Sequence, residues 1–321
     1  MNTPNNPSWF LSPDGIPIPV DPSTIDDQSQ LVSPVPIPFP LTDPSTIDNQ
    51  PANNQAGSDL IVGIPIPVLS DPLSPGVSPG YPAWAPPAVP FELVVTVENV
   101  CKEAFDGTMQ LRDVSFKLFK GKVACILGGV DDGAYPLLQV LALEELASRG
   151  SLSILNKEVS QLTIEERSEW HYTHIAYIRL SHLELVEQTP HMLVAYWLHY
   201  FDDIKWSEAK EAARLALRSV GLAQYKGDGR FRDLSPMEQA RVNIAKACAH
   251  SRRNRCMYLF EDCFLGVDHD EAVELIRLLT LVAARRGKVV VVQTNRQDIT
   301  SHFDQVLEMR NGELVTVRNN P

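Results

Sequence analysis

The stretch from Val123 to Val140 constrains the fold more than any other part of this chain. It begins with a short apolar run, Val123–Leu127, which ends at Gly128 and Gly129. Gly133 follows, and leucine and valine then recur at the spacing of one helical face. This order predicts a buried strand, a tight glycine turn and a helix N-terminus. Such a turn can cradle phosphate with backbone N–H groups and the helix dipole.

The phosphate-loop pattern G-x-x-x-x-G-K-[ST] places its two glycines at Gly128 and Gly133. The next position, where the pattern has lysine, holds Ala134, and the hydroxyl position holds Tyr135. The glycine frame is present, but the residues that contact phosphate and Mg²⁺ are missing. Two interpretations stay open at this point: residual phosphate binding by the backbone, and an ordinary strand-to-helix turn.

Residues 1–90 differ in composition from the rest of the 321-residue chain. They hold 21 of the 25 prolines and eight aspartates, with no Lys, Arg, Glu or His, and GIPIPV occurs at both Gly15–Val20 and Gly63–Val68. Alternating Ile-Pro removes backbone donors and disfavours helix, so we expect a disordered, extended segment without a packed core. It is either a solvated spacer or a ligand for proline-recognising domains. The folded domain is predicted over residues 91–321.

The remaining residues carry 28 basic and 40 − 8 = 32 acidic side chains, so this part has no basic footprint for nucleic acid. The five cysteines lack a disulfide spacing, which favours a reducing, cytoplasmic location. No signal peptide and no apolar run of about 18 residues is found, so we expect no membrane span. The eight histidines show no metal-ligand spacing, so no metal site is predicted.

Strand and helix patterns alternate after residue 91, which indicates an α/β protein with a parallel sheet and a helical insertion. Strands are predicted at 92–99, 111–118, 123–127, 151–155, 175–178, 256–260 and 288–293, with a final pair turning at Asn311-Gly312. Helices are predicted after the glycine turn and at 164–170, 191–201, 207–220, 236–250 and 269–286. The helix at 207–220 is predicted to begin with a capping residue.

Three later segments carry a family resemblance. LSPMEQARVNIAKA (Leu234–Ala247) resembles the signature helix L-S-G-G-x-x-x-R of ABC transporter ATPase domains. MYLFEDCFLGVD (Met257–Asp268) resembles the Walker B strand and the aspartate loop behind it, and VVVVQTNR (Val289–Arg296) resembles the strand leading to the switch histidine. Phe105, 23 residues before Gly128, lies where the family places an aromatic that stacks on adenine.

The resemblance covers about Phe91 to Val317, with the motifs in the family's order. It implies a P-loop NTPase-like ABC ATPase domain with a helical insertion, binding ATP and Mg²⁺ and working with a partner ATPase domain and transporter transmembrane domains. The GVD at Gly266–Asp268 and the run Tyr196–Phe201 resemble A-type lipid exporters, with G-type half-transporters as the alternative.

The match fails at most chemical positions. The loop lysine and metal-binding hydroxyl correspond to Ala134 and Tyr135, followed by Pro136. The family's Asp-Glu pair appears in reversed order as Glu261-Asp262. Ser235 retains the serine of the signature motif. The other departures are Pro236-Met237 in place of the signature glycines, Leu180 in place of the metal-contacting glutamine and Asn295 in place of the switch histidine.

We therefore expect weak ATP binding and little contribution from Mg²⁺, because the groups that grip phosphate and metal are replaced together. Two functions are compatible with this sequence: a non-hydrolysing or regulatory partner in transmembrane transport, and a working ATP-binding subunit whose degenerate site is completed by a partner chain. Phe105 is either a core residue or an adenine platform, and Glu261 and Asp262 are either solvated or capping acids or a metal pair. The candidate site residues are Glu261, Asp262 and Asn295 for catalysis, and Phe105, Gly128, Gly129, Gly133, Ala134, Tyr135, Ser235 and Asp268 for the nucleotide.

Overall fold

The computed structural model describes residues 9–11, 17–19, 92–179, 187–202, 204–222, 226–249 and 255–320. The chain divides into two compact units, Met1–Thr42 and Asp43–Pro321. In the first, β1 (Trp9–Leu11) pairs antiparallel with β2 (Pro17–Pro19). The rest of the predicted disordered segment 1–90 lies outside the described residues, and so does Leu180. The domain boundary at residue 90 stays a prediction.

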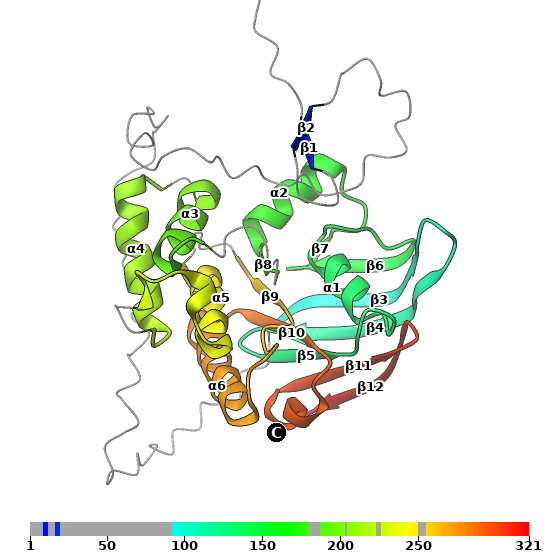
Figure 1. Ribbon diagram of the computed structural model, residues 1–321. Coiled ribbons are helices and arrows are strands. Elements are labelled where there is room, and N and C mark those ends of the chain that lie inside the picture. The colour runs from blue at the N-terminus through cyan, green and yellow to red at the C-terminus, as the bar shows by residue number, and fades with distance from the viewer. Residues whose placement is uncertain are drawn as a thin grey trace, which may run out of the picture. The chain divides into compact units, whose positions relative to one another are not determined.

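The second unit contains a six-stranded sheet and a four-stranded sheet (Figure 1). The larger sheet has the order β12-β11-β5-β10-β9-β8. Its strands are β5 (Val123–Leu127), β8 (Ile175–Ile178), β9 (Met257–Glu261), β10 (Val289–Thr294), β11 (Gln305–Arg310) and β12 (Glu313–Asn319). All neighbours are parallel except β12, which pairs antiparallel with β11. Every residue of β5 and β10 is buried, as expected for parallel strands covered on both faces.

The smaller sheet is antiparallel, and the sequence analysis did not predict that its strands form a sheet of their own. Its order is β4-β3-β6-β7, formed by β3 (Leu93–Glu103), β4 (Met109–Phe119), β6 (Arg149–Ile154) and β7 (Lys157–Glu158). A short turn of residues 104–108 joins β3 to β4, and strands joined so closely pair antiparallel, because a parallel pair needs a long crossover.

Helices complete the unit. They are α1 (Ala134–Leu141), α2 (Ile164–His174), α3 (Pro190–Asp202), α4 (Trp206–Ser219), α5 (Pro236–Ala249) and α6 (His269–Arg286), with two short 3₁₀ helices, η5 (Phe231–Asp233) and η6 (Gln297–His302). Helices α3, α4 and α5 pack on one another beside α6 (Figure 1). Among the described residues, no helix is both long enough and apolar enough to cross a membrane.

Helix boundaries follow local capping chemistry where the sequence supplies it. Helix α6 has the predicted bounds because the Asp268 carboxylate accepts the Glu271 N–H at 2.8 Å and Gly287 ends the helix with φ of 59°. The predicted cap of the helix at 207–220 is wrong. Helix α4 begins at buried Trp206, after Lys205, which makes no side-chain capping bond. Burial of the indole sets this helix start in place of a capping side chain.

Candidate functional site

The glycine loop, residues 128–133, connects β5 to α1. Gly128 has φ of 145° and Gly133, the N-cap of α1, has φ of 87°, a conformation that side chains disfavour. A Cβ on Gly133 would lie 2.7 Å from the Gln110 carbonyl oxygen and 2.9 Å from the Gly312 Cα. The Gly312 N–H in turn donates to the Asp132 carbonyl at 3.0 Å. Backbone packing alone therefore requires Gly133, whether or not phosphate binds.

Substitution of Gly133 by alanine is expected to destabilise the fold by about 3 kcal/mol, because the new methyl group meets backbone atoms at a strained φ. Gly129→Ala is the matched control, since its Cβ would meet only the Asp132 carboxylate, at 3.7 Å, and its φ is not positive. Urea unfolding of both variants measures the difference. Equal stability of the two variants would show that Gly133 is not packed closely against the backbone of Gln110 and Gly312.

A carboxylate of the chain itself lies inside the glycine loop. Asp132 Oδ2 accepts the Gly129 N–H at 2.9 Å. In a phosphate cradle such an N–H points to a phosphate oxygen. Sequence reasoning missed Asp132, although an aspartate three residues after a glycine can bond to its backbone in this way. The carboxylate both uses a donor of the loop and places negative charge where phosphate would have to bind.

Tyr135, which the sequence analysis predicts at the position of a metal-binding hydroxyl, is half-buried on the first turn of α1. Burial raises the pKa of Tyr135, the Glu261 carboxylate raises it further, and the Arg179 guanidinium acts in the opposite direction. The net effect of burial and these two charges is a raised pKa, which favours the neutral phenol.

Glu261, the last residue of β9, accepts a hydrogen bond from the Tyr177 hydroxyl at 3.1 Å. Burial, together with the charge of Glu261, raises the pKa of Tyr177. Arg179 pairs with Glu144, and its guanidinium carbon lies 5.0 Å from the centre of the Tyr177 ring. Tyr177 and Arg179 were not predicted as site residues, because nothing in their local sequence marks them and only the sheet brings them to Glu261.

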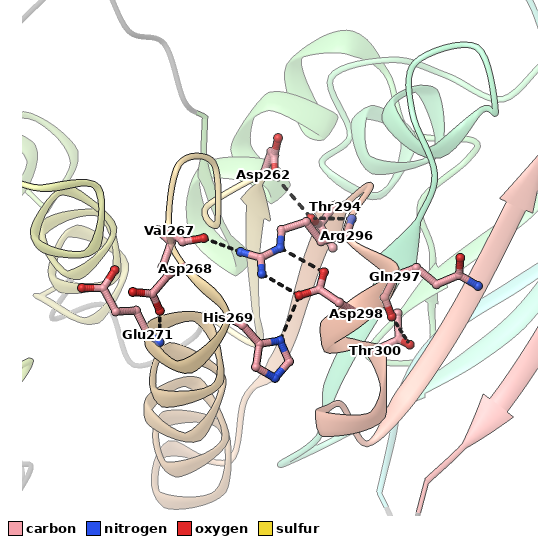
Figure 2. Close-up of polar contacts among 10 residues, drawn as sticks. All are labelled: Asp262, Val267, Asp268, His269, Glu271, Thr294, Arg296, Gln297, Asp298 and Thr300. Carbon is pink, nitrogen blue, oxygen red and sulfur yellow. Dashed lines mark hydrogen bonds and ion pairs between the residues drawn. The ribbon is translucent and has the colours of Figure 1, made fainter.

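Asp262, next to Glu261, has a left-handed backbone with φ of 36°. Its N–H donates to the Gln293 carbonyl at 2.9 Å, and its Oδ1 accepts the Thr294 hydroxyl at 3.3 Å (Figure 2). Both acids are thus bonded to neighbouring strands, and neither caps a helix. Among the described residues, no group of three or more His, Cys, Asp or Glu side chains could hold a metal ion.

The other predicted residues fall in different places. Ser235 and Glu238 form a reciprocal capping box at the start of α5, with bonds of 3.0 and 3.3 Å. Asp268 caps α6. Asn295 is exposed and lines a pocket of about 240 Å³ together with Gly129 and Asp132. Phe105, in the β3–β4 turn, is fully exposed, so it is not a core residue.

Strand order explains which of these residues meet. β10 lies between β5 and β9, with Gln293 opposite both Ile126 and Glu261. The glycine loop, the two acids and Asn295 therefore gather at the carboxyl ends of three adjacent parallel strands, where open α/β sheets bind ligands. Phe105 and Ser235 lie on other elements, the β3–β4 turn and the start of α5.

Solved structures with the same arrangement are ATP-binding cassettes. The chain aligns with one described as a post-hydrolysis dimer bound to ADP and Pi, with a TM-score of 0.61 and 20% identity over 71% of this chain and 99% of that one. A second, cbiO1 from Clostridium perfringens, gives a TM-score of 0.63 and 20% identity over 71% and 89% of the two chains. This domain has the fold of an ABC ATPase cassette.

Sequence similarity agrees with the predicted resemblance to ABC ATP-binding domains. The cassette is 24% identical over 236 residues to the macrolide export ATP-binding/permease protein MacB of Bradyrhizobium diazoefficiens, and 27% identical over 234 residues to MacB of Chlorobaculum tepidum. Each match covers 70% of this chain and 34% of the relative, so the chain spans about a third of the length of these relatives. No family model matches.

Proposed function

We propose that this cassette serves an ABC-type transport system as a partner whose own site does not hydrolyse ATP. The fold and the similarity to the ATP-binding/permease proteins support the transport context. The partners are then a second ABC-type ATPase domain and transmembrane domains, and the cassette works on the cytoplasmic side, attached to the membrane through them.

One observation carries the loss of hydrolysis: the bulky Tyr135 side chain, half-buried on the first turn of α1, takes the place of the expected metal-binding hydroxyl. Mg²⁺ requires small oxygen ligands and retained waters in near-octahedral geometry. A bulky, half-buried phenol is a poor ligand for this ion, and Glu261 is already bonded to Tyr177. The cation that assists transfer of a phosphoryl group therefore has no place prepared for it.

The Asp132 carboxylate supports the same conclusion from the other side of the loop. It accepts the Gly129 N–H that phosphate would otherwise use, and it repels phosphate charge. The adenine end is less altered, because exposed Phe105 offers a free ring face. We therefore propose weak nucleotide binding through the base, with a regulatory role for the cassette.

The absence of a metal site can be tested with Mn²⁺, which substitutes for Mg²⁺ and has an electron paramagnetic resonance signal. Adding the chain to Mn²⁺ and ATP is expected to leave the signal unchanged, because Tyr135 stands at the proposed metal position and the Glu261 carboxylate is already bonded to Tyr177. A hydrolysing cassette serves as the positive control. One bound Mn²⁺ per chain, lost in Asp262→Asn protein, would contradict the proposal.

A further inference from the structure

The carboxyl end of β10 is bonded to the loops on both sides of it. The Gly128 N–H donates to the Thr294 carbonyl at 3.0 Å, and Gln293 Nε2 donates to the Gly128 carbonyl at 2.9 Å. On the other side, the Asp262 N–H donates to the Gln293 carbonyl at 2.9 Å. One strand end therefore fixes the start of the glycine loop and the turn after β9.

Arg296, just beyond this strand end, reaches further. Its Nη1 donates to the Val267 carbonyl at 2.5 Å, and its Nε and Nη2 donate to the two carboxylate oxygens of Asp298 at 3.2 and 2.7 Å. Asp298 Oδ2 also lies 2.9 Å from Nδ1 of His269, the first residue of α6. Figure 2 shows the guanidinium between Val267 and Asp298, with His269 below the carboxylate.

These contacts join two loops that are distant in sequence. Val267 lies in the connection between β9 and α6 and His269 begins α6, while Arg296 and Asp298 follow β10. The Arg296 backbone N–H also donates to the Thr294 hydroxyl at 3.3 Å, which itself bonds to Asp262. The arginine is therefore attached at its backbone to β10 and at its side chain to the loop entering α6.

Charge around Arg296 is complementary. Its bonds to Asp298 raise the pKa of Arg296, and the nearby Asp262 and Asp268 charges act in the same direction. The Arg296 and His269 side chains hold the pKa of Asp298 well below its usual range. Exposed ion pairs commonly contribute little. This one differs, because the Arg296 side chain is only 22% exposed, and its guanidinium binds the carboxylate in bidentate fashion and makes a third bond to a backbone carbonyl.

We propose that Arg296 and Asp298 form a latch that holds the loop 262–268 in one position against the loop 295–298 in the nucleotide-free chain. The role of this latch rests on the proposed function. In a cassette that does not hydrolyse ATP, the side chains of the chain itself would keep these two loops in a fixed position. Arg296 is in this sense a positioning residue, acting through the loop that carries Asp262.

Hydrogen exchange followed by mass spectrometry tests the latch without nucleotide. The amides of Leu265, Val267 and Glu271 are bonded within or next to the held loop, so they report its opening. In Arg296→Met protein their exchange is expected to become about tenfold faster, because local opening no longer breaks a charge-assisted contact. Amides of β5 and β10 should keep the wild-type rate.

Arg310→Met is the matched control. Arg310 binds Glu308 through Nε and Nη2 at 3.1 and 2.6 Å, but both residues lie in β11, so this pair bridges no loops. The Arg310→Met variant should leave hydrogen exchange in residues 262–268 at the wild-type rate. Arg296→Lys should lie between wild type and Arg296→Met, since one ammonium cannot keep both the bidentate contact and the Val267 bond.

Asp298→Asn gives an independent test if Arg296→Met folds poorly. It should speed exchange in 262–268, and combining it with Arg296→Met should add little more, as expected for two parts of one contact. Wild-type exchange in both single variants, or equal acceleration in Arg310→Met, would overturn the latch. Because no nucleotide is present, such a failure would leave the absence of hydrolysis untouched, and detectable hydrolysis would leave the exchange result untouched.

Discussion

The purified chain is expected to hydrolyse Mg-ATP no faster than a protein-free blank. Phosphoryl transfer depends on positioned cations and donors, and removal of one such group commonly costs a factor of about 10² to 10³ in rate. In the proposed match to the family's motifs, Ala134 stands in place of the lysine, Tyr135 in place of the metal hydroxyl and Asn295 in place of the histidine. Because these groups would act on one transition state, their losses do not add, yet any one is enough to suppress turnover.

A sensitive phosphate-release assay on wild type and Asp262→Asn protein measures this. Asp262 is the proposed counterpart of the family's general base, so the variant distinguishes activity of this chain from that of a contaminating ATPase. Equal, blank-level rates in both proteins are expected. Magnesium-dependent release that is present in the wild type and absent in the variant would refute the proposed loss of hydrolysis.

The second large effect concerns nucleotide selectivity and its restoration. In the wild type, ATP, ADP and AMP are expected to bind weakly and within about threefold of one another, because the helix dipole and the remaining loop N–H groups contribute little without a lysine. Phe105→Ala should weaken all three by about 1–3 kcal/mol, the contribution of a base stacked on an aromatic ring. Calorimetry with and without Mg²⁺ measures these affinities.

Ala134→Lys combined with Tyr135→Ser supplies a phosphate-binding ammonium and a metal-binding hydroxyl on the first turn of α1. We expect this double variant to prefer Mg-ATP over AMP by at least about tenfold, since one charge-assisted contact is worth this much. Adding Asp132→Ala, which frees the Gly129 N–H, should strengthen the preference further. No gain in either variant would show that the loop is not a phosphate loop, and micromolar Mg-ATP binding by the wild type would refute the weak-site proposal.

The sequence was most informative where local pattern and fold agree. The continuous apolar runs at Val123–Leu127 and Ile175–Ile178 predicted β5 and β8 with their observed bounds. Helix α6 was also predicted with its bounds, since Asp268 and Gly287 mark its two ends. The antiparallel sheet was missed because alternation identifies a strand but does not say which strand it will pair with.

The site was predictable only in part for the same reason. Motif spacing located the glycine loop, the two acids and Asn295 at the strand ends. Two contacts beside these residues, Tyr177 with Glu261 and Arg296 with Val267, join residues 84 and 29 positions apart, and motif spacing does not predict that they form. Such contacts arise from the order of strands in the sheet, which one sequence does not reveal.

The turn between β11 and β12 supports the glycine loop through a backbone hydrogen bond to Asp132. Asn311 and Gly312, both with positive φ, make a tight hairpin turn of the kind commonly chosen for inserting tags or joining new termini. Here the Gly312 N–H donates to the Asp132 carbonyl, and the Gly312 carbonyl accepts the Arg112 N–H. A Cβ atom added to Gly312 would lie only 2.6 Å from the Gln110 carbonyl oxygen. A protein engineer should therefore keep this turn intact and attach labels elsewhere, because lengthening it would release the loop from the small sheet.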